Sequence, residues 1–108
     1  MSEREAMFKE MTSQFPDSAM GHFSLGRLYV DERRWAEAVI ALSQAVLLDP
    51  VYAAAWVALG DAHAGAGART EARNAWNRAL ETPLGRRDLS LDRALASGGP
   101  GGAGAQAG

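Results

Sequence analysis

The chain has 108 residues, with 11 Lys or Arg against 13 Asp or Glu, so its net charge is -2. A chain of this length forms one domain at most, with little room for a deep active-site cavity. A weakly acidic protein has no global field that attracts phosphate backbones or anionic lipid, so neither nucleic acid nor a membrane surface is an expected partner. The sequence has no Cys, which excludes disulfides, thiolate zinc sites and cysteine nucleophiles.

The N-terminal residues 1–11 read MSEREAMFKEM, which is too charged for the apolar core of a signal peptide. No stretch approaches the roughly 18 uninterrupted apolar residues of a membrane-spanning helix, so we expect a cytoplasmic protein. The first predicted element is a helix over residues 2–14. It begins with a capping box formed by Ser2 and Glu5, and Pro16 follows it.

Two pairs of helices come next, each with apolar residues at helical spacing. In the first pair, the polar break DERR at residues 31–34 is so short that only an antiparallel hairpin can form. In the second pair the break reads GAGAR at residues 65–69, where we expect Gly65 and Gly67 to take the positive φ of a tight helix end. Each pair is closed by a proline, which ends a helix: Pro50 and Pro83.

The two pairs match one another at an offset of 34 residues. Gly26 and Gly60 recur mid-helix, where glycine costs about 1 kcal/mol relative to Ala. We expect the second helix of each hairpin to approach closely there, because Ala38 and Ala72 on that helix also lack bulk. Seven positions are identical in the two copies: Ala19/Ala53, Leu25/Leu59, Gly26/Gly60, Glu37/Glu71, Ala38/Ala72, Ala41/Ala75 and Ala45/Ala79.

The C-terminal part divides into two segments. Residues 85–96 contain a predicted short helix that begins at Asp88 and has Leu91, Ala94 and Leu95 on one face. Residues 97–108 are almost all Gly and Ala, and we expect them to be disordered.

The residue pattern does not predict catalysis. His22 and His63 are the two imidazoles of the sequence, and both fall on the stripes that pack one helix against the other. Neither has the neighbours of a catalytic triad or metal site, and the glycines at 65–67 do not follow a strand as in a phosphate-binding loop. The charged runs at 32–34 and 86–88 lack interleaved aromatic side chains and are assigned to solvent. We expect no enzyme activity, no metal and no cofactor.

Several runs together resemble tetratricopeptide repeats: Trp56-x2-Leu59-Gly60, Leu25-Gly26-x2-Tyr29, WAEA at 35–38 and ALSQAVLLDP at 41–50. The resemblance implies an all-α fold, a right-handed superhelix of antiparallel helix hairpins with about two and a half repeats. The chain departs from the family pattern at His22, His63 and the early Pro83. The implied organisation is an N-terminal half-repeat at 1–17, a first repeat at 18–52, a second at 53–84, a C-terminal capping helix at 85–96 and the tail at 97–108.

The resemblance also implies that the first helix of each hairpin lines a concave groove that binds another protein or a peptide, as in a scaffold or adaptor. Met20, Phe23 and Val57 would form an apolar patch there, flanked by Arg27 and Asp61. In an alternative interpretation, Met20 and Phe23 pack under the N-terminal helix. A separate alternative for the function is a self-assembly module that pairs as a homodimer. The residues expected in the groove are Met20, Phe23, Ser24, Arg27, Asp31, Ala54, Val57, Ala58, Asp61 and Ala64.

Overall fold

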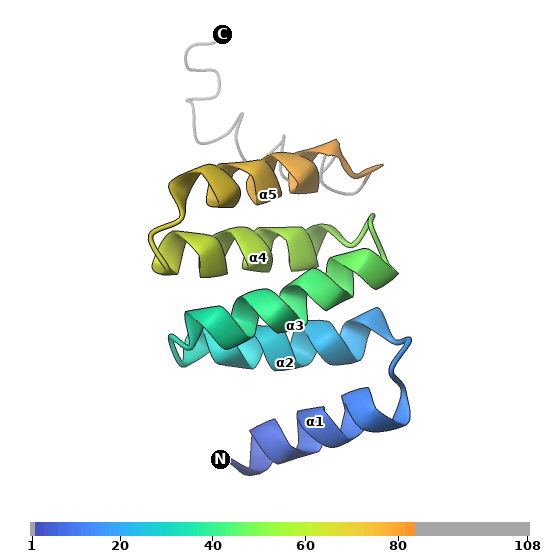
Figure 1. The fold of residues 1–108 in the computed structure, drawn as a ribbon. Helices are drawn as coiled ribbons and strands as arrows, with labels where there is room; N and C mark the ends of the chain where they lie inside the picture. Colours follow the sequence, from blue (N-terminus) through green and yellow to red (C-terminus); the bar gives the residue numbers. More distant parts are fainter. Residues whose placement is uncertain (1, 84–108) are drawn as a thin grey trace, which may run out of the picture.

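The computed structural model describes residues 2–83, and within this range every regular element is an α-helix. The helices stack one upon the next in chain order, as Figure 1 shows. This arrangement confirms the all-α helical repeat expected from the sequence. The predicted C-terminal helix at 85–96 and the tail at 97–108 lie outside the described residues. The helices are α1 (Glu3–Gln14), α2 (Ala19–Asp31), α3 (Trp35–Leu48), α4 (Ala53–Gly65) and α5 (Arg69–Glu81).

The turns inside the two hairpins, α2–α3 and α4–α5, have the same geometry. Arg33 has a φ of 60° and Gly67 a φ of 84°, and these residues stand 34 apart in the sequence. The next amide in each turn reaches back to a carbonyl of the preceding helix, Arg34 N to Tyr29 O and Ala68 N to His63 O, both at 2.8 Å. These bonds define the Schellman motif, which satisfies carbonyls at a helix end. The expectation for Gly67 is confirmed, whereas Gly65 does not have a positive φ.

Glycines let the two helices of each hairpin pack closely. A Cβ added to Gly26 would overlap the Leu42 side chain of α3, and one added to Gly60 would overlap Trp76 of α5. The predicted close approach is therefore confirmed, although the residues that fill the space are the large Leu42 and Trp76. Gly65 has a similar role between the hairpins, because a Cβ there would overlap the ring of Trp35. Large side chains seated on glycine thus connect α2 to α3, α3 to α4 and α4 to α5.

The joints between successive repeats also match. The ring Nε2 of His22 lies 3.0 Å from the carbonyl oxygen of Pro16, and Trp56 Nε1 donates to the carbonyl oxygen of Pro50 at 2.8 Å. A carbonyl oxygen only accepts, so His22 Nε2 carries the hydrogen in this contact. His22 therefore makes the same contact with the preceding proline carbonyl that Trp56 makes one repeat later.

Candidate functional site

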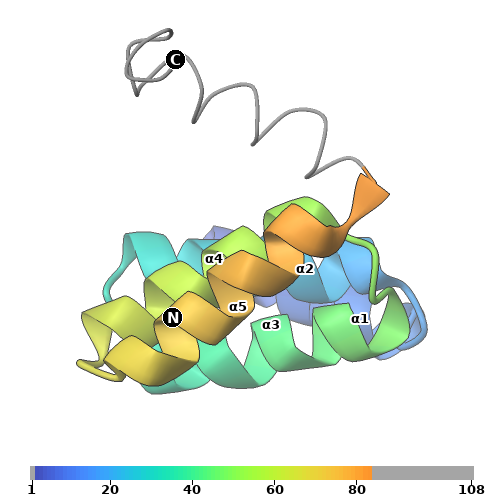
Figure 2. The same cartoon turned by 90° about the horizontal axis from the view of Figure 1, so that it is seen from above.

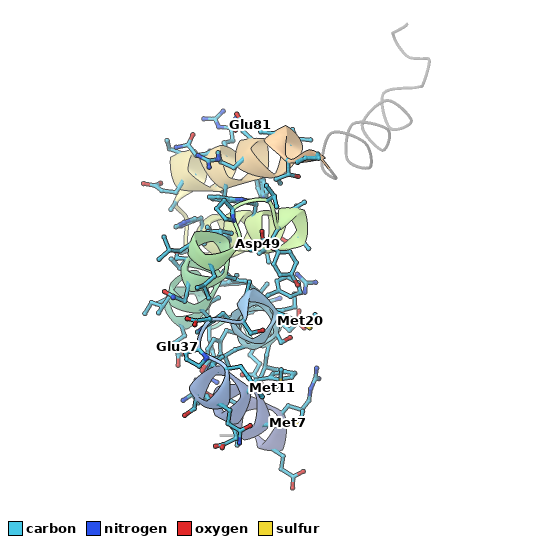
Figure 3. All side chains as sticks on the ribbon, turned by 90° about the vertical axis from the view of Figure 1, so that its right-hand side faces the viewer. Met7, Met11, Met20, Glu37, Asp49 and Glu81 are labelled. Carbon is cyan, nitrogen blue, oxygen red and sulfur yellow. The ribbon has the colours of Figure 1, made fainter. Side chains whose placement is uncertain are left out.

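The residues predicted to line the groove come from α2 and α4, which contact each other in the stack. We call the surface formed by Met20, Phe23, Ser24, Arg27, Asp31, Ala54, Val57 and Asp61, together with Tyr52, the α2–α4 face. Figure 3 shows its labelled member Met20 on the side of the stack opposite Glu37 of α3. Met20 is 63% exposed, so most of its side chain lies at the surface.

An aromatic pair forms the apolar part of the α2–α4 face. The ring centroids of Phe23 and Tyr52 lie 5.0 Å apart, tilted by 39°, and both rings are half-buried against the core. This spacing is typical of a favourable aromatic contact. Met20 lies three residues before Phe23 and so extends the apolar surface along the same side of α2. Phe23 is therefore partly a packing residue and partly a surface residue.

Tyr52 was not among the residues predicted from the sequence. It stands at the N-cap of α4, where the equivalent residue of the first repeat is Ser18, a preferred N-cap type, although neither side chain makes a capping hydrogen bond. An aromatic residue at a position that favours Ser or Asp is a signal that the side chain has another role. Burial raises the pKa of the Tyr52 hydroxyl, and the nearby charge of Asp49 raises it further.

Charged groups flank the aromatic pair. Arg27 Nη1 lies 3.9 Å from Asp61 Oδ2 across the two helices, and Arg27 Nε lies 3.9 Å from Asp31 Oδ1 on its own helix. Long, exposed ion pairs of this kind contribute little to stability, so these groups can exchange partners at low cost. The other oxygen of Asp61 accepts a hydrogen bond from Trp76 Nε1 at 3.2 Å, which holds the carboxylate in position.

One predicted groove residue is wrong. Ala58 is 2% exposed and belongs to the hydrophobic core, because it lies about 100° around α4 from Val57 and faces the neighbouring helices. It cannot present its side chain to a partner. The structure leaves Arg27, Asp31, Ala54 and Ala64 exposed and Ser24, Val57 and Asp61 half-buried.

A buried polar cluster on the other side of α2 was also missed. Glu5 of α1 is 2% exposed, and its carboxylate lies 2.7 Å from Arg34 Nη1 and accepts a hydrogen bond from the Tyr29 hydroxyl at 3.0 Å. The predicted capping box is half formed: Glu5 N donates to Ser2 Oγ at 3.1 Å, but the carboxylate turns inward to Arg34. Arg34 also binds Glu37 at 2.6 Å. We call Glu5, Tyr29, Arg34 and Glu37 the α1 anchor.

The electrostatics of the α1 anchor follow from these contacts. Hydrogen bonding to the Arg34 guanidinium lowers the pKa of Glu5 to about 2, despite the opposing effect of burial. Burial, with the hydrogen bond to Glu5, raises the pKa of Tyr29 to about 12. All of these groups therefore keep their usual charge at neutral pH, with Arg34 paired to both carboxylates. The cluster joins α1 to the first hairpin, and its groups are engaged with each other and not poised for proton transfer.

A hollow of about 490 Å³ lies beside this cluster, between α1 and α3 and with α2 as its floor. A second hollow, formed by α4 and α5, is lined at equivalent positions of the next repeat, so the two are a consequence of the repeat itself. Within residues 2–83, no group of three or more His, Asp or Glu residues is placed to hold a metal ion. The first hollow is lined by Lys9, Thr12, His22, Leu25, Tyr29, Glu37, Ile40, Ala41 and Gln44.

In the part of the chain that the structure describes, no helix is long and apolar enough to cross a membrane.

Comparison with known proteins agrees with the helix stack. A family model described as tetratricopeptide repeat matches residues 23–88. A TPR repeat-containing protein of Pseudomonas aeruginosa is 32% identical over 87 residues, which cover 81% of this chain and 83% of that protein. Members of this family are generally protein interaction or scaffold modules. The matched span begins within α2 and covers the rest of both described hairpins, including the Gly26–Leu42 and Gly60–Trp76 contacts that hold them together. The chain belongs to the tetratricopeptide repeat family.

Proposed function

We propose that this chain is a protein interaction module whose α2–α4 face binds a peptide segment of a partner protein. The observation that carries the proposal is the aromatic pair of Phe23 and Tyr52, with exposed Met20 beside it and Arg27 one turn further along α2. Apolar anchors next to a charge of each sign are typical of peptide recognition, because the apolar contacts supply affinity and the charges fix direction.

The charges on this face can orient a bound peptide. Arg27 stands between Asp31 on its own helix and Asp61 on α4, so a ligand on this face meets one positive group with a negative group on each side. A peptide with an acidic and a basic side chain beside apolar residues would pair with Arg27 and with Asp31 or Asp61, and would cover Met20. The long Arg27–Asp31 and Arg27–Asp61 contacts are weak enough to be replaced by such a ligand.

The proposal can be tested by selecting dodecapeptides from a random display library on the immobilised wild-type chain. We expect the selected peptides to bind at least roughly tenfold more weakly to a Met20→Glu, Arg27→Gln variant, because both contacts are exposed anchors on one face. The control is Leu47→Glu, which changes a 72% exposed side chain on α3 and should leave peptide affinity unchanged.

Helicity by circular dichroism should be the same in all three proteins, since each substituted side chain is largely solvent-exposed. Equal peptide affinity for wild type and the double variant would show that this face is not the binding site. Failure to select any peptide at micromolar affinity would contradict peptide binding altogether.

A further inference from the structure

Helix α3 carries an exposed apolar stripe that the fold does not use. Ile40 and Leu47 are each 72% exposed, and the exposed Ala36 and Ser43 complete a row at helical spacing. We call Ala36, Ile40, Ser43 and Leu47 the α3 stripe. The eleven residues from 38 to 48 contain no charged side chain. Two large apolar side chains two turns apart on one exposed face, with no charge between them, indicate a contact surface.

The other hairpin shows that this position in the stack does not require apolar residues. At the positions equivalent to the α3 stripe, 34 residues later, α5 has the exposed polar residues Thr70, Asn74, Asn77 and Glu81. Thirty-four residues earlier, α1 has Ala6, Lys9 and Ser13 at the last three positions. The two hairpins otherwise pack alike, so Ile40 and Leu47 are not needed for the hairpin fold.

We propose that the α3 stripe is a self-association surface, on which a second copy of the chain packs its own α3 in the antiparallel direction. The two large side chains of the stripe, Ile40 and Leu47, stand equally far from the point between Ser43 and Gln44. A two-fold axis through that point sets Ile40 of each copy against Leu47 of the other, as an isologous interface requires. The small side chain of Ser43 lies where the two helices would approach most closely.

Either direction of pairing brings two acidic side chains together at each end of the uncharged segment. A parallel pair would set Glu37 against Glu37 and Asp49 against Asp49, at the two ends of the uncharged segment. In the antiparallel pair, Glu37 of each copy lies within about one residue of Asp49 of the other, so the antiparallel direction rests on the contact of Ile40 with Leu47. A net charge of -2 per chain adds little repulsion between copies.

The hollow beside the stripe supplies room for the contact. Ile40, Ala41 and Gln44 form its α3 wall, opposite Lys9 and Thr12 of α1. In the antiparallel pair, Leu47 of one copy comes next to Ile40 of the other, at the edge of this hollow. Each copy contributes one leucine and one hollow, so the surface is complementary to itself.

The area available sets the strength of the interaction. A helix of 14 residues is about 21 Å long, and a single helix pair buries less than the roughly 800 Å² per partner of a standard interface. We therefore expect a weak dimer that dissociates in the roughly hundred-micromolar range. This inference goes beyond peptide binding, since Figure 3 shows Glu37 of α3 and Met20 of the α2–α4 face on opposite sides of the stack.

The first test is sedimentation equilibrium of the full chain over a concentration series from about 5 to 500 μM, a range chosen to bracket the expected dissociation constant. The mass should rise from 11.4 kDa towards twice that value. An Ile40→Asn, Leu47→Glu variant gives α3 the residues that α5 already carries at the equivalent positions, and it should remain monomeric.

A second test does not depend on that variant folding well. The chain has no Cys, so Ser43→Cys introduces a single thiol at the proposed two-fold axis, and Asn77→Cys introduces its equivalent on α5. We expect disulfide-linked dimers to form at least roughly tenfold faster for Ser43→Cys, because proximity raises the effective thiol concentration. A wild-type monomer throughout the series, unchanged association of the α3 variant, or equal cross-linking of the two thiols would each overturn the proposal. Peptide binding is read out separately and would survive any of these results.

Discussion

Arg33 occupies a backbone conformation that suits glycine. Its φ of 60° lies in the left-handed region, which costs a non-glycine residue roughly 1–2 kcal/mol. Gly67 holds the same position in the second hairpin without that cost. Since both turns make the same backbone hydrogen bonds, the hairpin geometry imposes this conformation whatever residue is present.

Glycine at position 33 and arginine at position 67 should therefore change the free energy of unfolding in opposite directions. We expect Arg33→Gly to raise the free energy of unfolding by up to about 1 kcal/mol, because the left-handed strain is relieved while the unfolded chain gains some freedom. Gly67→Arg should lower it by a similar amount. Urea unfolding followed by circular dichroism measures both. Destabilisation by Arg33→Gly would mean that contacts of the Arg33 side chain outweigh the strain.

Single residues were also where the sequence was least informative about the candidate site. The exposed members of the α2–α4 face could be predicted because helical spacing alone places Met20, Arg27 and Asp31 on one side of α2. Tyr52 lies outside any helix, so no periodicity assigns it a face. The misplaced Ala58 shows the limit of the same method, since a rotation of one residue around a helix moves a side chain from the surface to the core.

At the scale of helices, the glycine seats determine how closely each hairpin packs. Gly26 and Gly21 both lie in α2 and are buried, but their surroundings differ. A Cβ on Gly26 would overlap Leu42, whereas one on Gly21 would lie 3.6 Å from Thr12 Cγ2, an ordinary van der Waals contact. The same substitution therefore has two different expected effects on one helix.

Gly26→Ala should destabilise the chain by about 1–3 kcal/mol, since the overlap forces α2 and α3 apart or moves Leu42 off its rotamer. Gly21→Ala should be neutral or stabilise by up to about 1 kcal/mol, because alanine favours the helix. Thermal and urea unfolding of the two variants provide the comparison. A smaller residue at position 42 should partly rescue Gly26→Ala; equal stability of both glycine variants would contradict the close approach.

The elements themselves were largely predictable because their signals are local. The helix expected over residues 2–14 is α1, with Ser2 as its N-cap, and the break DERR contains the α2–α3 turn. Apolar spacing, prolines and glycines act within a few residues of their position. The contact between Glu5 and Arg34 spans 29 residues, and no local pattern indicates it. The sequence instead suggests that Glu5 forms a capping box with Ser2.

At the scale of the whole molecule, α1 is attached to the stack at one edge. It packs on α2, and the α1 anchor adds the buried contacts of Glu5 with Arg34 and Tyr29. Figure 2 looks down on the stack from above, with α5 in front and α1 behind. A helix at the end of a linear stack has fewer neighbours than one in its middle, so it depends more on each contact.

Acid should therefore weaken this attachment. The pKa of Glu5 is lowered from 4.5 to about 2 by its hydrogen bond to Arg34, so its contribution is present above pH 4.5 and is lost as the pH falls towards 2. We expect the melting temperature of the wild type to fall more steeply between pH 5 and 3 than that of Glu5→Gln, which should be less stable at pH 7. Glu10→Gln, an exposed change on the same helix, should keep the wild-type slope. Parallel curves for wild type and Glu5→Gln would contradict the assignment.

The matching joints at Pro16 and Pro50 have a consequence for how this chain can change in length. His22 and Trp56 bind the two proline carbonyls in the same way, so each hairpin begins at an identical kind of junction. The hairpin also ends as α1 ends, because Phe15 N bonds to Met11 O and Asp49 N to Ala45 O. Duplication of the 34-residue unit between these joints would create no new type of interface. Addition of further repeats would therefore require only the contacts that are already present at the Pro16 and Pro50 joints.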